Sequence, residues 1–205
     1  MDFLPLLVLL AVAAYLLKAK DQKKRIILLA QHLGKYPIEK LMETVMTGYA
    51  RALSETVPER QVQVWALQNA HETALSEQFN RFVADFSKLA APDTLVSKLA
   101  FSFPYANQLF PNATFDVRQA FAIHAQGLAS AAKCDPSTST NTNAKRRAFA
   151  FSAELFLMQH TCHWFCRSKT VASARLLARH KTAYAQVLEA VAPATRRAYL
   201  ALTTV

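Results

Sequence analysis

Glycine is scarce in this sequence: only Gly34, Gly48 and Gly127 occur among 205 residues. Glycine supplies the positive φ angles of tight hairpin turns, so its scarcity argues against a β-rich protein. It also leaves no glycine-rich loop of the kind that cradles nucleotide phosphates. The long segments are rich in alanine, leucine, glutamine and lysine, which favour helices. We therefore expect an all-α fold.

The sequence also lacks the motifs of several common catalytic sites. No glutamate is followed three residues later by a histidine, which excludes the paired Glu-x-x-His motifs of di-iron helical bundles. There is no His-Glu-x-x-His metalloprotease motif and no Gly-x-Ser-x-Gly nucleophile elbow. We therefore expect that the protein is not an enzyme and binds no cofactor.

Charge is absent from one long segment near the N-terminus. Residues 3–17 read FLPLLVLLAVAAYLL, and a basic cluster follows at once: Lys18, Lys20, Lys23, Lys24 and Arg25. A secretory signal peptide carries its positive charges before the apolar run, whereas here they come after it. We interpret residues 1–17 as a single transmembrane anchor and 18–35 as a basic extension of the same helix. The alternative is an N-terminal helix buried in the protein core.

The order of apolar and basic residues predicts how the anchor is oriented. The positive-inside rule places the short N-terminus outside and the rest of the chain in the cytoplasm, and we take the bacterial inner membrane as the membrane concerned. Fifteen residues at ~1.5 Å each reach ~22 Å, against a bilayer core of ~30 Å. Lys18 can extend its ammonium group toward the headgroups and so close part of this gap.

The remaining residues, 36–205, predict one domain of about six helices. Between a front half, 36–133, and a back half, 145–205, lies a polar stretch, 134–144, that we expect to be a mobile loop. One helical stripe is expected along Leu67, His71, Leu75, Phe79, Phe82, Val83 and Phe86. Helices are expected over 38–53, 58–86, 94–103, 114–128, 145–169, 171–191 and from 193 onward.

The segment HTCHWFC, residues 160–166, holds two histidines and two cysteines in seven positions. On a helix, the stretch from 148 to 166 is apolar on two opposite faces, which is typical of a helix buried in the centre of a bundle. Cys162 and Cys166 are four residues apart, too far for a disulfide on one helix. Cys162, His163 and Cys166, with His160, are candidate zinc ligands or reactive thiols, and buried packing residues are the alternative.

Positive charge is concentrated in the C-terminal third. The whole chain carries +10, and residues 145–205 contain ten basic but only two acidic residues. Such an excess of positive charge can bind anionic lipid, an acidic protein partner or nucleic acid. It can also belong to a surface that faces only solvent. Nucleic acid is not expected, because no motif supports it. The candidate basic patch combines the cluster at 18–25 with Arg175, Arg179, Lys181, Arg196 and Arg197.

Together these features predict a single-pass membrane protein with a cytoplasmic helical domain. Its expected partners are the lipid bilayer and a protein in the membrane, and its expected role is that of an interaction or scaffold protein, such as an accessory subunit of a membrane complex. One alternative is a metal- or thiol-dependent activity at His160, Cys162, His163 and Cys166. The other is binding of anionic lipid or nucleic acid through the basic C-terminal third.

Overall fold

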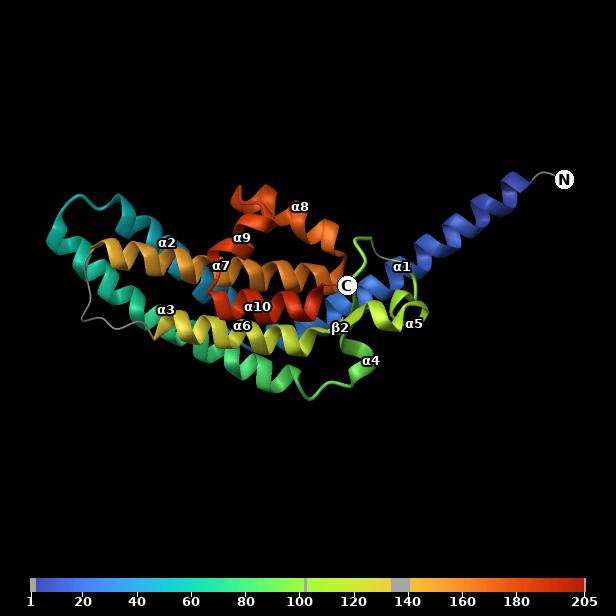
Figure 1. Cartoon of the computed structure of the whole chain (residues 1–205), viewed down its shortest axis with the longest axis horizontal. Helices are drawn as coiled ribbons and strands as arrows, with labels where there is room; N and C mark the ends of the chain where they lie inside the picture. Colours follow the sequence, from blue (N-terminus) through green and yellow to red (C-terminus); the bar gives the residue numbers. More distant parts are fainter. Residues whose placement is uncertain (1–2, 102, 134–140, 205) are drawn as a thin grey trace.

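The computed structural model describes residues 3–101, 103–133 and 141–204, and the described residues are mostly helical (Figure 1). The expected helical fold is confirmed. The helices are α1 (Phe3–Leu33), α2 (Ile38–Ser54), α3 (Pro58–Phe86), α4 (Ala91–Thr94), α5 (Ala106–Leu109), α6 (Val117–Ala132), α7 (Asn141–Cys166), α8 (Lys169–His180), α9 (Tyr184–Ala190) and α10 (Pro193–Thr203). The other elements are a 3₁₀ turn, η1 (Pro111–Ala113), and the strands β1 (Leu95–Ser97) and β2 (Thr114–Asp116).

The helices form an elongated bundle with two different ends (Figure 1). At one end α1 leaves the bundle and projects well beyond it, and α4, α5 and β2 lie at that same end. The turn between α2 and α3 lies at the opposite end. The molecule therefore has an end marked by the projecting helix and an end remote from it.

Helix α1 is a single unbroken helix of 31 residues. The sequence contains no helix breaker between Pro5, which lies in the first turn, and Gly34, which follows the last helical residue. The Gly34 amide donates to the Ala30 carbonyl at 2.9 Å and closes the final turn. The apolar run and the basic cluster are thus parts of one rigid rod.

Helix α7 is the centre of the bundle, as its two apolar faces predict. It packs against α6, α8 and α9 and also touches α1 and α2. Side chains from both faces are buried, including Phe151, Leu155, Leu157, Met158 and Phe165. The helix starts at Asn141 rather than near Lys145, so 141–144 are not part of a loop. The rest of the predicted loop, 134–140, lies outside the described residues.

The core contains a cluster of phenylalanine rings between α3 and α6. Phe79, Phe82 and Phe86 follow one another along α3, and Phe121 of α6 meets all three edge to face at ring-centroid distances of 5.2–6.3 Å. Each such pair contributes ~0.5–1.5 kcal/mol beyond the burial of its surface. The prediction that this stripe of α3 faces the core is therefore confirmed for the C-terminal half of the helix.

The N-terminal half of α3 faces the core differently from our prediction. Leu67 is exposed and His71 is only half buried, whereas Trp65, Gln68 and Glu72 are buried. Apart from Ser76, the buried positions of α3 are 65, 68, 72, 75, 79, 82 and 86, which alternate in steps of three and four as in a heptad pattern. The prediction followed the apolar residues and therefore missed the polar positions of this face.

Two further expectations about the elements are wrong. Residues 94–103 do not form a helix: α4 ends at Thr94, and β1 pairs antiparallel with β2 from Leu95 opposite Asp116 to Ser97 opposite Thr114. The expected helix 171–191 is divided into α8 and α9 at Lys181, whose φ of 54° is left-handed. The first break depends on the pairing of β1 with β2, which a local helical pattern does not contain. At the second break the Lys181 amide donates to the Leu177 carbonyl and closes the last turn of α8.

Candidate functional site

The first half of α1 packs against nothing in the protein. All residues from 3 to 17 are exposed, and their large apolar side chains are 43–71 % accessible. Within the described part of the chain, α1 is the only helix long and apolar enough to cross a membrane. A helix of a protein core would bury this surface, so the alternative of an N-terminal core helix is wrong.

The second half of α1 is bound firmly to the domain. Gln22 is buried, and its side-chain oxygen accepts a hydrogen bond from Arg167 at 2.8 Å. Arg25 donates to the Leu95 carbonyl at 3.0 Å and lies over the Phe165 ring at 5.5 Å. These contacts tie α1 to the end of α7 and to β1. The direction of the projecting helix is therefore fixed relative to the domain.

The basic cluster on α1 divides into bound and free residues. Lys24 pairs with Asp93 at 2.6 Å, and Arg25 with Asp21 at 3.0 Å. Lys18, Lys20 and Lys23 have no carboxylate within ion-pairing distance in the part of the chain that the structure describes. These three lysines remain available to an anionic surface.

The two histidines of the HTCHWFC segment lie in different surroundings. His160 is fully buried, its Nε2 lies 3.0 Å from Ser173 Oγ, and its ring stacks on Tyr184 at 4.3 Å. Burial lowers the pKa of His160 to about 3, so the ring is neutral at physiological pH. His163 is half buried, and its Nδ1 accepts from Arg175 at 3.2 Å. The histidines do not converge on one centre.

Cys162 and Cys166 of the HTCHWFC segment are free thiols. Burial raises the pKa of Cys162 far above its usual range and that of Cys166 to about 11. Nucleophilic and metal-binding cysteines act as thiolates, and this environment favours the protonated form. Cys162, His163 and Cys166 line one groove, from which His160 is absent. In 3–101, 103–133 and 141–204, no three His, Cys, Asp or Glu side chains are placed to hold a metal ion.

The groove that contains these residues lies between α1, α2, α7 and α8. Its two parts have volumes of about 770 and 440 Å³ and share Glu39, Met42, Gln159 and Arg179. Met46 lines one part and Met158 the other, so every methionine after Met1 borders this groove. Met42 and Met158 are themselves buried, so Met46 is the methionine that the groove leaves partly accessible.

The C-terminal basic residues do not form one patch. All five are exposed. Arg175 and Arg179 lie on α8 at the edge of the groove, and Lys181 follows the end of that helix. Arg196 and Arg197 lie on α10, which packs on α6 and β2, whereas α8 packs on α7 and α9. The charge that the sequence concentrates in one third of the chain is distributed over two surfaces.

Sequence reasoning missed a buried polar chain in the core. His124 Nε2 lies 2.8 Å from Thr161 Oγ1, which lies 3.0 Å from the Tyr199 hydroxyl. Burial, followed by the charge of His160, lowers the pKa of His124 to about 3. The chain joins α6, α7 and α10 deep in the domain. Tyr199 also hydrogen-bonds to the half-buried Tyr184. The direct effect of this chain of hydrogen bonds is to fix the register of the helices that it joins.

A second buried polar cluster joins α2, α3 and α7. The Tyr49 hydroxyl donates to Glu72 Oε1 at 2.6 Å, and Arg147 Nε lies 3.4 Å from Glu72 Oε2. Arg147 also donates to Asn69. Burial raises the pKa of Glu72, which the hydrogen bond from Tyr49 and the charge of Arg147 partly oppose. The heptad spacing of α3 was the one signal in the sequence that could have placed Glu72 in the core.

Comparison with known proteins gives no relative: no family model, curated protein or solved structure matches this chain. Function must therefore be argued from two accessible features, the apolar half of α1 and the groove between α1, α2, α7 and α8. The buried polar clusters each have hydrogen bonds within the protein, although some of their atoms, such as His124 Nδ1 and His160 Nδ1, have none among the described residues.

Proposed function

We propose that the chain is a single-pass membrane protein whose helical domain lies on the cytoplasmic side and binds a protein partner as an accessory subunit of a membrane complex. The observation that carries this proposal is the exposure of all residues 3–17 on a helix whose second half packs one side against the domain through Gln22 and Leu29. In this proposal residues 3–17 cross the bilayer, and the domain begins directly where they end.

The energetics of α1 support a membrane rather than water around its first half. Burying a large apolar side chain contributes ~1.5–3 kcal/mol. Eleven such side chains between Phe3 and Leu17 are about half exposed, so their transfer to lipid contributes on the order of 10 kcal/mol. The three free lysines, Lys18, Lys20 and Lys23, follow on the side that the positive-inside rule assigns to the cytoplasm.

Membrane attachment is tested with matched pairs of exposed apolar residues. Leu9→Asp with Leu10→Asp places two carboxylates in the apolar run, at a cost of ~2.5–3.5 kcal/mol each near the bilayer centre. Val62→Asp with Leu67→Asp makes the same kind of change on exposed residues of α3. After cell fractionation, the first variant is expected in the soluble fraction and the second in the membrane. Equal distribution of both variants would contradict the proposal.

Orientation is tested separately with a reporter that is active only outside the cytoplasm, fused after the C-terminus. The fusion is expected to be inactive, because the lysines that follow the apolar run retain this side in the cytoplasm. A fusion to the N-terminus is expected to be active. The reversed result would show that the domain is exported and that the orientation is wrong.

The groove between α1, α2, α7 and α8 is the proposed docking site for the partner. Its α1 side is lined mainly by apolar side chains, Arg175 and Arg179 stand at one edge, and Glu39 lines both of its parts. An amphipathic helix fits such a groove by placing its apolar face on the partly accessible Ile26, Leu33 and Met46 and its acidic residues against the arginines. The C-terminal basic residues are divided between α8 and α10, which pack on different helices, so they do not support one continuous surface that binds anionic lipid or nucleic acid.

The docking site is tested by charge reversal on two surfaces. Arg175→Glu with Arg179→Glu changes the groove edge, and Arg196→Glu with Arg197→Glu makes the identical change on α10. Affinity purification from native membranes, followed by mass spectrometry, is expected to lose the partner only with the α8 variant. Loss of the partner with the α10 variant alone would place the interface on α10.

A further inference from the structure

Five large apolar side chains are exposed within ten positions that follow β1. Their exposed fractions are 50–65 %, and they are Phe101, Phe103, Tyr105, Leu109 and Phe110. We call them the aromatic patch. Of the five exposed aromatic side chains outside α1 in the described residues, four belong to this patch and the other is Phe149. Exposed apolar residues that occur singly need no explanation, but a concentration of this kind indicates an interaction surface.

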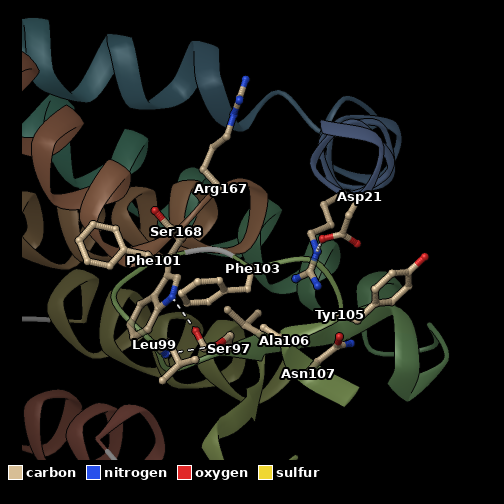
Figure 2. Close-up of a pocket in the computed structure, with 13 residues that line it drawn as sticks. Asp21, Ser97, Leu99, Phe101, Phe103, Tyr105, Ala106, Asn107, Arg167 and Ser168 are labelled. Carbon is tan, nitrogen blue, oxygen red and sulfur yellow. Dashed lines mark hydrogen bonds and ion pairs between the residues drawn. The ribbon is translucent and has the colours of Figure 1, made fainter. Parts of the chain in front are cut away.

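The aromatic patch lies beside α1 at the point where its apolar run ends. Tyr105 lines one cavity together with Leu17 and Lys20. Phe101, Phe103 and Tyr105 line a second cavity together with Asp21 of the same helix. Figure 2 shows Tyr105 near Asp21, with α1 seen almost end-on beside the loop.

The position along α1 gives the depth of the patch. Residues 17–25 cover ~12 Å of helix at ~1.5 Å per residue. The headgroup layer on each side of a bilayer is ~5–8 Å thick, beyond a hydrocarbon core of ~30 Å. If residues 3–17 lie in the hydrocarbon core, side chains level with Leu17 to Asp21 lie in the headgroup layer. Tyrosine is enriched at this depth because its ring is apolar and its hydroxyl reaches water, and exposed Phe and Leu side chains of membrane-surface segments bury at the boundary between headgroups and acyl chains.

The backbone holds the patch outward instead of allowing it to fold onto the core. On the near side of the patch, the Ala100 carbonyl accepts hydrogen bonds from the Thr170 amide at 3.2 Å and from its hydroxyl at 2.7 Å. Within the patch, Ala106 is buried. Tyr105, directly before it, has a φ of 56°, a left-handed conformation that non-glycine residues rarely adopt. The bonded Ala100 and the buried Ala106 thus hold the exposed residues between them.

We infer that the aromatic patch enters the headgroup layer of the leaflet from which α1 emerges and forms a second membrane contact beside the anchor. This inference rests on the proposed function, because it requires residues 3–17 to be in the bilayer. Its consequence is a fixed orientation. A single helix leaves the domain free to rotate about the anchor axis, and a second contact displaced from that axis stops the rotation.

Lipid is the occupant that the position of the patch favours. The patch lies at the end of the bundle from which α1 projects, with α5, whereas the α2–α3 turn is remote (Figure 1). A protein partner on the same residues would have to displace lipid from beside the anchor. The free Lys18 and Lys20 next to the patch add attraction for anionic headgroups.

Tryptophan reporters in the full-length chain test the inference. The protein is reconstituted into phosphatidylcholine vesicles brominated either near the headgroup end or near the methyl end of the acyl chains. Phe103→Trp reports on the patch, Leu10→Trp on the anchor, and Phe149→Trp on an exposed aromatic position of α7 outside the patch. Phe110→Trp is a second patch reporter, and the wild-type emission of the two native tryptophans is subtracted.

We expect the emission of Phe103→Trp to lie further to the blue than that of Phe149→Trp, and to be quenched more by the shallow bromines than by the deep ones. Leu10→Trp should be quenched by the deep bromines. Phe149→Trp should not be quenched. If Leu10→Trp is quenched but neither Phe103→Trp nor Phe110→Trp is, the patch lies outside the bilayer and the inference fails alone. If Leu10→Trp is not quenched, the proposed anchor itself fails. A blue shift without quenching would show that protein, such as a second copy, covers the patch. If Phe149→Trp is quenched as strongly as Phe103→Trp, the membrane contact is not specific to the aromatic patch and the inference also fails.

Discussion

Replacing His124 with glutamine should make the stability of the domain less sensitive to acid. The His124 side chain is fully buried, and its Nε2 lies 2.8 Å from Thr161 Oγ1. Thr161 Oγ1 donates to the Leu157 carbonyl at 3.1 Å, so we assign the ring proton to Nε2, which donates to Thr161. Nδ1 is buried and has no hydrogen-bond partner among the residues that the structure describes. A second proton on this nitrogen would therefore create a buried charge without an acceptor.

The size of the effect follows from the two pKa values of His124. Burial holds the pKa at about 3 in the folded state, whereas an unfolded histidine has a pKa of ~6.5. The unfolded state therefore binds a proton first, and the free energy of unfolding decreases as the pH falls below ~6.5. At ~1.36 kcal/mol per pH unit, acidification from pH ~7.5 to ~5 removes about 2 kcal/mol through His124.

Glutamine keeps an amide donor near the position of Nε2 but has no proton to gain. Urea unfolding of the full chain in detergent micelles, followed by the fluorescence of the buried Trp65 and Trp164, measures the free energy at each pH. Wild type is expected to lose about 2 kcal/mol more than His124→Gln over this range. The raised pKa values of Glu72 and Glu154 act in the opposite direction, but they are common to both proteins. An identical pH dependence in both proteins would refute the argument.

Three further predictions concern single side chains of the core and use the same unfolding measurement at neutral pH. Gly127→Ala is expected to cost about 1–3 kcal/mol, because a Cβ there would collide with the buried Glu154 carboxylate; an unchanged stability would contradict this packing. Tyr49→Phe is expected to cost about 1–3 kcal/mol by removing a donor from the buried Glu72, and a smaller loss in the Glu72→Gln background would identify that bond as the cause. Cys162→Ala is expected to cost about 1 kcal/mol and to leave the metal content unchanged, so zinc lost with this thiol would show a metal site.

Periodic and compositional features of the sequence were sufficient to predict the main helices. The two apolar faces of 148–166 predict the buried α7, and the missing helix breakers predict the length of α1. These predictions succeed because they depend on neighbours within one helix. The helical interpretation of 94–103 fails because β1 exists only through its pairing with β2, about twenty residues later in the chain.

The candidate site was less predictable than the fold for the same reason. The four residues of the HTCHWFC segment are adjacent in sequence, but packing turns His160 toward Ser173 and leaves Cys162 and Cys166 facing the groove. The groove itself needs side chains from four helices. Glu72 illustrates the limit most clearly, because its buried position is visible only when polar residues are included in the periodic pattern of α3.

The rigid connection between anchor and domain determines what the groove can reach. Its α1 side is formed by residues between Ile26 and Leu33, which lie ~14–24 Å beyond Leu17 along the helix at ~1.5 Å per residue. This distance exceeds the ~5–8 Å of the headgroup layer, so with α1 in the bilayer the groove opens above the lipid. An acyl chain in the bilayer does not reach that height, whereas a short juxtamembrane helix of a membrane protein does. Under the proposed function, the same geometry favours a protein partner over lipid phosphates as the contact of Arg175 and Arg179, and it predicts that their reversal affects partner binding without releasing the chain from the membrane.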